Sequence, residues 1–230
     1  MLKNRSKKRI AILCSVIVAC IVIIVSLIVL FLHFGKGQTY TVSFYSDDGT
    51  MLKMDAVTKH QAATPPVQPE MSYGNIFVKW DKDFSDITSD IDVHPITKPI
   101  KGETNVFALS GTYGQKETEV FVPLQLCGDV LLSGFELKIQ YDSQSLELLS
   151  VFNVDGGVVY NDAEPGVIKI NYVSVENTTA DVDVCTFKFK IKADKGEIPI
   201  STNVVNAYAN DGDNMKKVDY VTIGASAFVY

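Results

Sequence analysis

The side chains that could carry out chemistry are few and scattered in this chain of 230 residues. A nucleophilic triad needs a histidine beside its serine or cysteine, and no histidine follows His94. The carboxylate pairs Glu117 with Glu119 and Asp181 with Asp183 have the residue types for acid–base catalysis. Both pairs fall in predicted loops or at strand edges, where solvation accounts for them. We therefore predict that the chain is not an enzyme and carries no cofactor.

Metal-binding patterns are equally sparse. His60 and His94 are isolated, with no cysteine or acidic cluster beside them at the spacing of metal ligands, and we predict that both are solvated. Residues 210–214 read Asn-Asp-Gly-Asp-Asn, which is similar to the start of a calcium loop. The bidentate glutamate of an EF-hand does not follow, so the sequence favours a plain turn and no metal site.

Only two of the four cysteines, Cys127 and Cys185, lie beyond the apolar N-terminal segment. Strand parity directs Cys185 toward the core together with Phe187 and Phe189, and directs Cys127 to the opposite side. A disulfide between them is possible but disfavoured, and the chain does not have the pattern of a disulfide-stapled secreted scaffold.

The elements that must position these residues are strands. After residue 35 the apolar residues alternate with polar ones at period two, and no helical stripe of useful length appears, which indicates an all-β fold. In the strand that contains Phe135, Leu137 and Ile139, we expect the apolar side to face the core and the polar side to face solvent. The strands expected in the second part of the chain are Glu119–Leu126, Gly134–Asp142, Leu146–Asn153, Val158–Asn161, Val167–Val175, Cys185–Lys192, Ile198–Val205 and Tyr220–Val229.

The N-terminus reads as a membrane anchor. Residues 10–34 contain no acidic or permanently basic side chain and would span about 37 Å as a helix. Residues 1–9 form a basic tail with five Lys and Arg side chains, so the positive-inside rule places the N-terminus in the cytoplasm and the rest of the chain outside. A cleaved signal peptide would be shorter and end in a small-x-small site, and lipidation at Cys20 would leave an apolar start on the mature chain, so both are weaker interpretations.

Charge limits the partners of the outer part. The whole chain carries a formal net charge of −6 although its first nine residues are basic, so the outer part is clearly acidic. An acidic surface of this kind is poorly suited to nucleic acid or anionic lipid. We expect the membrane to be contacted through residues 10–34 only.

Residues 39–97 resemble an internalin-type B repeat, a small β-grasp-like module. The resemblance rests on Tyr-x-Val-x-Phe-Tyr at 40–45, Ala-x-x-Pro-Pro-like residues at 62–66, Gly-x-x-Phe-x-x-Trp-Asp at 74–81 and Ile-Thr-Ser-Asp at 87–90. It departs at His60-Gln61, where the family usually has glycine before the alanine, and at Lys79, where it usually has glycine before the tryptophan. Trp80 could stack on a sugar, but a place in the small core of the module is the favoured interpretation. Prolines and a glycine then predict a linker at residues 98–104.

Residues 105–230 resemble a cohesin domain along nearly their whole length. The resemblance rests on residues 120–126 (VFVPLQL), 132–142 (LSGFELKIQYD), 146–151 (LELLSV), 166–172 (GVIKINY) and 185–193 (CTFKFKIKA), and it departs at Cys185, where the family usually has a larger apolar residue. It implies a nine-stranded jelly-roll sandwich that binds a dockerin, a small helical module stabilised by calcium. The calcium is expected on the dockerin and not on this chain.

The resemblance also implies where the partner binds, on the sheet face formed by the third, fifth, sixth and eighth strands. Carried onto this chain, the candidate contacts are the outward residues Glu136, Lys138 and Gln140 of the third strand and Lys169, Asn171 and Val173 of the sixth. A mixed polar face with one apolar patch is typical of a specific, reversible interface. The alternative for each residue is an ordinary solvated sheet face.

The leading hypothesis is a cell-surface anchoring scaffoldin whose single cohesin binds dockerins of secreted enzymes or scaffold proteins and tethers them to the membrane. Polysaccharide would then be contacted only indirectly. The alternative is a carbohydrate-binding surface adhesin, which needs exposed aromatic side chains, and Tyr160 and Tyr208 are the candidates. A passive structural spacer is a third interpretation.

Overall fold

The computed structural model describes residues 20–27, 37–67, 69, 71–72, 74–100, 105–129, 132–152, 158–174, 182–212 and 214–230. Residues 20–27 are helical. Within the described residues, no helix has the length and apolarity needed to cross a membrane. The predicted basic tail at 1–9 and most of the predicted anchor at 10–34 lie outside the described residues, as do residues 101–104 of the predicted linker.

Residues 40–230 form one compact unit, and its first part is a pair of small sheets. Strands β1 and β2 form a hairpin, in which a turn with Gly49 at a φ of 87° joins two neighbouring strands. Strand β4 pairs in parallel with the other edge of β1, and β3 pairs antiparallel with β5 in a second sheet. The bounds are β1 Thr39–Tyr45, β2 Met51–Thr58, β3 Asn75–Trp80, β4 Ile91–Val93 and β5 Pro95–Pro99. We call residues 39–100 the N-terminal module.

Trp80 belongs to the core of this module. Its side chain is only 3% exposed, and its ring meets those of Phe44 and Phe77 edge-on at centroid distances of 5.2 and 5.0 Å. Aromatic rings prefer this edge-to-face geometry, and each such pair adds about 0.5–1.5 kcal/mol beyond burial. The core interpretation of Trp80 is confirmed, and its use as a sugar-stacking platform is excluded.

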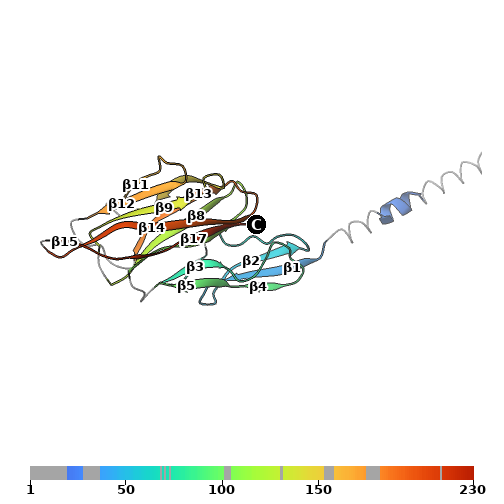
Figure 1. Ribbon diagram of the computed structural model, residues 1–230. Coiled ribbons are helices and arrows are strands. Elements are labelled where there is room, and N and C mark those ends of the chain that lie inside the picture. The colour runs from blue at the N-terminus through green and yellow to red at the C-terminus, as the bar shows by residue number, and fades with distance from the viewer. Residues whose placement is uncertain are drawn as a thin grey trace, which may run out of the picture. The chain divides into compact units, whose positions relative to one another are not determined.

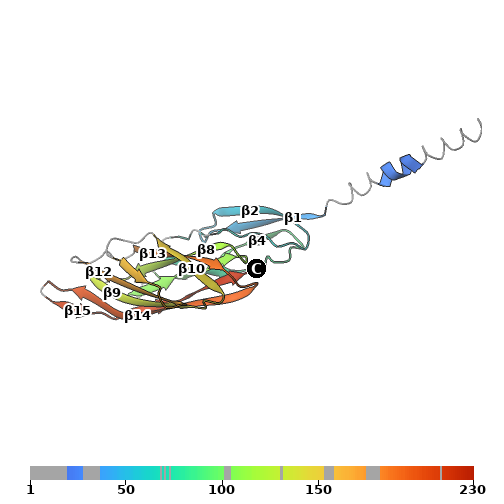
Figure 2. The same cartoon turned by 90° about the horizontal axis from the view of Figure 1, so that it is seen from above.

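The second part is a two-layer β-sandwich. One layer has the strand order β10-β13-β8-β6-β16, and the other has the order β11-β12-β9-β14-β17-β7 with β15 paired to β14 (Figures 1 and 2). The bounds are β6 Val106–Leu109, β7 Thr112–Gly114, β8 Glu119–Cys127, β9 Gly134–Tyr141, β10 Leu146–Phe152, β11 Val158–Asn161, β12 Val167–Val173, β13 Val182–Ile191, β14 Gly196–Asn210, β15 Met215–Lys217, β16 Val221–Ile223 and β17 Ala225–Val229. The predicted β-sandwich is confirmed.

Two strands of the sandwich are interrupted, and the two halves of each pair in different layers. Strand β6 pairs with β8 in one layer, and after Gly111 the chain continues as β7 beside β17 in the other. Strands β16 and β17 are divided in the same way at Gly224, where a Cβ atom would lie 2.7 Å from the carbonyl oxygen of Ile200. If each broken strand is counted once, the described sandwich has nine strands plus the short β15. In this count β9 is the third strand, β11 the fifth, β12 the sixth and β14 the eighth.

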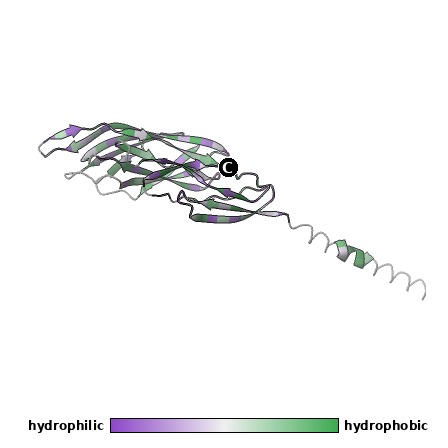
Figure 3. Cartoon of the chain, turned by 90° about the horizontal axis from the view of Figure 1, so that it is seen from below, coloured by the Kyte–Doolittle hydropathy of each residue, from purple (hydrophilic) through white to green (hydrophobic). Residues whose placement is uncertain are grey.

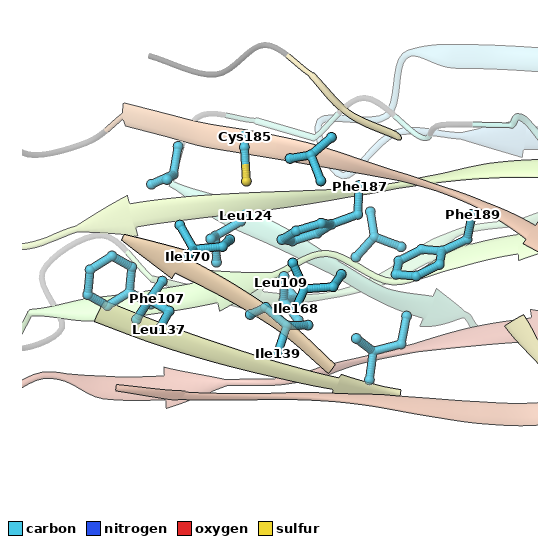
Figure 4. Packing of buried hydrophobic residues seen from close by; sticks show 14 of the residues in the cluster. Phe107, Leu109, Leu124, Leu137, Ile139, Ile168, Ile170, Cys185, Phe187 and Phe189 are labelled. Carbon is cyan, nitrogen blue, oxygen red and sulfur yellow. The ribbon is translucent and has the colours of Figure 1, made fainter. Parts of the chain in front are cut away.

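Alternation along the strands builds the core between the layers. Figure 3 shows apolar and polar residues alternating along the strands, and Figure 4 shows side chains from both layers pointing toward one another. Ile168 and Ile170 from β12 meet Phe187 and Phe189 from β13, all at 0% exposure. The parity predicted for the cysteines is confirmed, because Cys185 lies in this core and Cys127 lies in a separate cluster with Val106 and Ala108; the two are not joined by a disulfide.

The N-terminal module and the sandwich share buried contacts. The N–H group of Gly111 donates a hydrogen bond to the carbonyl oxygen of Phe77 (2.7 Å), and the N–H group of Trp80 donates one to the hydroxyl of Tyr113 (3.2 Å). Ile76 and Ile100 of the module are buried in the same cluster as β6 and Cys127. These contacts make the two parts one packed body.

Candidate functional site

The six predicted contact residues lie together on one side of two adjacent strands. Strands β9 and β12 pair antiparallel, so Lys138 faces Lys169, Glu136 faces Asn171, and Gln140 faces Val167. Val173 faces Gly134 at the end of the pair and is 74% exposed. The neighbouring residues of opposite parity, such as Leu137 and Ile170, are buried in the core.

The same face continues over a strand on each side, with residues that the sequence prediction did not name. On β14, Ser201, Asn203, Asn206 and Tyr208 face Gln140, Lys138, Glu136 and Gly134, and on β11, Val159 and Asn161 face Asn171 and Lys169. The face is therefore built on β11-β12-β9-β14, which are the fifth, sixth, third and eighth strands of the nine (Figure 1). We call these outward residues the β11-β12-β9-β14 face. The alternation of Ile198, Ile200 and Thr202 was the signal that could have identified Ser201 and Asn203, whereas the register shift between Val204 and Asn206 hides Asn206 and Tyr208.

Four rows of side chains cross this face. The first contains Asn161, Lys169, Lys138 and Asn203; the second contains Val159, Asn171, Glu136 and Asn206; the third contains Val173, Gly134 and Tyr208; and a fourth, beyond the first, contains Val167, Gln140 and Ser201. In the second row, the Nδ2 group of Asn206 donates a hydrogen bond to Oε2 of Glu136 (3.2 Å), and the Tyr208 hydroxyl lies 3.5 Å from Oδ1 of Asn206. The face is thus lysine-rich at one side and apolar at the other, with amides between.

The described residues of the two carboxylate pairs are not arranged for acid–base catalysis. Glu117 and Glu119 form ion pairs with Lys190 (2.6 Å) and Lys188 (2.5 Å), and the hydrogen bond to Lys190 lowers the pKa of the Glu117 carboxyl. A carboxylate held in its ionised form by a lysine is a structural ion pair and not a poised acid. Asp181 lies outside the described residues, and the side chain of Asp183 accepts a hydrogen bond from Gln125 (2.9 Å).

Histidines and acidic residues do not gather into a metal site in the part of the chain that the structure describes. His60 is exposed and pairs with Asp86 (3.0 Å), and exposed His94 stacks on Tyr45 with ring centroids 4.9 Å apart. Both histidines are thus at the surface, as predicted.

The aromatic candidates for sugar binding do not share a face. Tyr208 lies on the β11-β12-β9-β14 face. Tyr160 faces Ile170, whose side chain is buried in the core, so Tyr160 lies on the other side of the sheet at its edge. With Trp80 buried as well, these three residues form no exposed aromatic line of the kind that a carbohydrate-binding face needs.

The sandwich is similar to those of solved cohesins. The chain is similar to the seventh type I cohesin of ScaB from Pseudobacteroides cellulosolvens, with a TM-score of 0.51, 16% identity, and coverage of 55% of this chain and 92% of that one. It is equally similar to a cohesin–dockerin complex containing the OlpA cohesin of Clostridium thermocellum, with a TM-score of 0.51, 16% identity, and coverage of 56% and 100%. No curated protein matches the chain.

A protein-family model identifies the same domain from the sequence. The cohesin-domain model matches residues 106–227, which is more than half of the chain and corresponds to strands β6 to β17. Cohesin domains are binding modules without catalytic activity. The chain therefore belongs to the cohesin family.

Proposed function

We propose that this chain is a surface receptor that binds dockerin modules on its β11-β12-β9-β14 face and tethers the proteins that carry them. The observation that carries the proposal is the four-stranded face itself, which is built on the third, fifth, sixth and eighth strands of a cohesin sandwich. The similar OlpA structure is a complex of a cohesin with a dockerin, which supports the choice of partner.

The composition of the face fits a reversible protein interface. Val173 and Val159 are 74% and 63% exposed, and they stand beside amides and charged side chains. Apolar residues bordered by polar groups give both affinity and a defined orientation. The proteins that dock would be secreted enzymes or scaffold proteins, so polysaccharide would be reached through them.

The tether in this proposal is residues 10–34, with residues 1–9 in the cytoplasm. Support comes from the apolar length of this segment and from the basic residues before it. The N-terminal module, which resembles an internalin-type repeat, would hold the sandwich away from the membrane. Cell fractionation tests this part: the full chain should remain with the membrane after a high-salt wash, and a chain starting at residue 37 should be released.

Binding is tested with the full chain in detergent and a panel of calcium-loaded dockerins from the same genome. At least one dockerin should bind, and removal of calcium with EDTA should abolish binding because the dockerin unfolds. The variant Val173→Arg should weaken binding, since it places a charge on the apolar part of the face. Val221→Arg is the matched control, because Val221 is 55% exposed on β16 in the other layer. Binding of no dockerin, or equal effects of the two variants, would refute the proposal.

A further inference from the structure

Two lysines stand directly opposite each other on the β11-β12-β9-β14 face. Lys138 of β9 and Lys169 of β12 are register partners, which places their Cβ atoms about 4.5–5.5 Å apart. Like charges at such positions destabilise a sheet. Their neighbours in the same row, Asn161 and Asn203, are neutral amides. Neither lysine forms an ion pair with any described carboxylate.

On the other layer of the sandwich, two lysines form ion pairs. Lys188 and Lys190 of β13 each contact a glutamate of the β7–β8 region, Glu119 at 2.5 Å and Glu117 at 2.6 Å. The chain as a whole has 27 acidic and 21 basic residues, so carboxylates are not scarce. Both lysines of β13 are thus neutralised by glutamates, whereas Lys138 and Lys169 face each other without such a partner among the described residues.

The acidic residue nearest along the strand does not neutralise this pair. Glu136 lies two residues from Lys138 on the same side of β9, but its carboxylate accepts the hydrogen bond of Asn206 from β14. An external partner that brings carboxylates to the face would relieve the repulsion between the lysines and gain two attractions. Such complementarity gives specificity and speeds association.

We propose that the preferred partner is a dockerin whose contact helix carries two carboxylates one helical turn apart, placed over Lys138 and Lys169. This inference rests on the proposed dockerin-binding function. Side chains at positions i and i+4 of a helix have Cβ atoms about 5–6 Å apart, which matches the spacing of the two lysines. Apolar side chains of the same helix cover Val159, at the β11 end of the amide row, and Val173 in the row beyond it.

The chemistry of the whole chain favours a protein helix over a larger polyanion. Nucleic acid and anionic membranes present extended negative charge, which an acidic chain repels outside the small lysine patch. A helix with two local carboxylates meets only the patch. It also supplies the apolar contacts that the exposed valines require.

The test uses the full chain and two calcium-loaded dockerins that differ only at two contact-helix positions one turn apart, Glu/Glu in one and Lys/Lys in the other. The Glu/Glu dockerin should bind on the order of 100-fold more tightly, and its affinity should fall with added salt. The charge-reversed chain, with Lys138→Glu and Lys169→Glu, should invert this preference. The matched control, with Lys188→Gln and Lys190→Gln, removes two lysines from the other layer and should leave the preference unchanged.

The outcomes separate this inference from the proposed function. Equal affinity for the two dockerins, or a preference that survives the charge reversal, overturns the inference while dockerin binding stands. Binding of neither dockerin overturns both. Phosphatidylserine vesicles and a single-stranded oligonucleotide test binding to a polyanion. The inference is also overturned if either one binds more tightly than the dockerin and this binding requires Lys138 and Lys169. Thermal unfolding of each variant verifies that it is folded.

Discussion

Replacing Tyr113 should weaken the junction between the N-terminal module and the sandwich. Tyr113 lies in β7 of the sandwich, where its ring stacks on Phe228 with centroids 4.7 Å apart. Its other contacts are with the module: the hydroxyl accepts the hydrogen bond of the Trp80 N–H group, and the ring meets Phe77 and Phe84 at 6.0 and 5.6 Å. The variant Tyr113→Ala removes all of them.

The size of the effect follows from these contacts. Tyr113→Phe removes only the hydroxyl, and the loss of one hydrogen-bond partner costs about 1 kcal/mol. A fully buried aromatic side chain replaced by alanine costs about 3–5 kcal/mol, and since Tyr113 is half-buried we expect about half of that for the ring. The sum for Tyr113→Ala is about 3 kcal/mol, which lowers the Tm of a unit of this size by roughly 6–12 °C.

The chain contains its own probe for the assay. Trp80 is the only tryptophan and lies in the core of the module, so its fluorescence reports the module, whereas far-UV circular dichroism reports mostly the sandwich. In guanidinium unfolding of the full chain, the two signals should change together. Tyr113→Ala should lower the fluorescence midpoint below the circular-dichroism midpoint. The control Phe121→Ala removes a half-buried ring packed on Phe152 away from the junction, and should leave the two midpoints coincident.

Two results would refute this reasoning. One is a stability loss for Tyr113→Ala below about 1 kcal/mol, the range of ordinary surface substitutions and single hydrogen bonds. The other is separate transitions in the unmodified chain, which would show that the buried contacts of Phe77, Trp80 and Tyr113 do not couple the two parts.

Three further predictions use groups outside the binding face. Burial raises the pKa of Tyr113 and of Tyr220 to about 12, so the folded chain favours their neutral phenols. This contribution to stability is complete below the unfolded pKa of 10.0 and is lost as the pH rises toward 12. Tyr220→Phe should therefore reduce the fall in Tm at alkaline pH. His60 has a φ of 65°, so His60→Gly should raise the free energy of unfolding by about 1 kcal/mol relative to His60→Ala, measured by denaturant unfolding. Cys185 is fully buried, and burial raises the pKa of its thiol to about 12, so mass mapping should find it unlabelled by a thiol reagent in the folded chain and labelled after unfolding.

Each of these predictions has an outcome that contradicts it. An alkaline fall in Tm that is identical in Tyr220→Phe and the unmodified chain would remove the phenol from the explanation. Equal stability of the glycine and alanine variants would show that residue 60 carries no backbone strain. Rapid labelling of Cys185 in the folded chain would mean that the sandwich core opens far more often than its packing indicates.

The strands that could be predicted from the sequence are those with one face in the core and one face in solvent. Strands such as β9 and β12 alternate between core and solvent, so parity alone identified Glu136 and Lys169 as outward residues. Strand β6 was missed because Val106–Leu109 is buried on both sides, between the sandwich core and the cluster that includes Ile76 and Ile100, and a continuous apolar run has no period. The predicted end of β14 at Val205 fell short because a register shift between Val204 and Asn206 changes its parity, and the strand continues to Asn210.

The order of strands in the sheet limits what sequence can say about the site. Strand β9 has β12 and β14 as neighbours, which are far along the chain, so Asn203 and Asn206 could not be joined to Lys138 and Glu136 from periodicity. The junction was hidden for a similar reason. Residues around Pro95 and Pro99 look like the start of a linker, yet they pair with Trp80 and Asn75 at the two ends of β5, an edge position where proline is tolerated.

One long strand connects the junction to the binding face while keeping their roles apart. The first residues of β14, Gly196–Ile200, pair with β17, which carries Phe228 beneath Tyr113; the residues from Ser201 to Tyr208 pair with β9 and form part of the face. Because a strand within two paired neighbours is stiff along its length, the module can fix the position of the sandwich without supplying any residue to the face. The proposed dockerin receptor would need this separation to stay in place while its partner binds and leaves. In that proposal Lys138 and Lys169 set partner choice, while the stability of the body depends on contacts at the opposite end of the same strand.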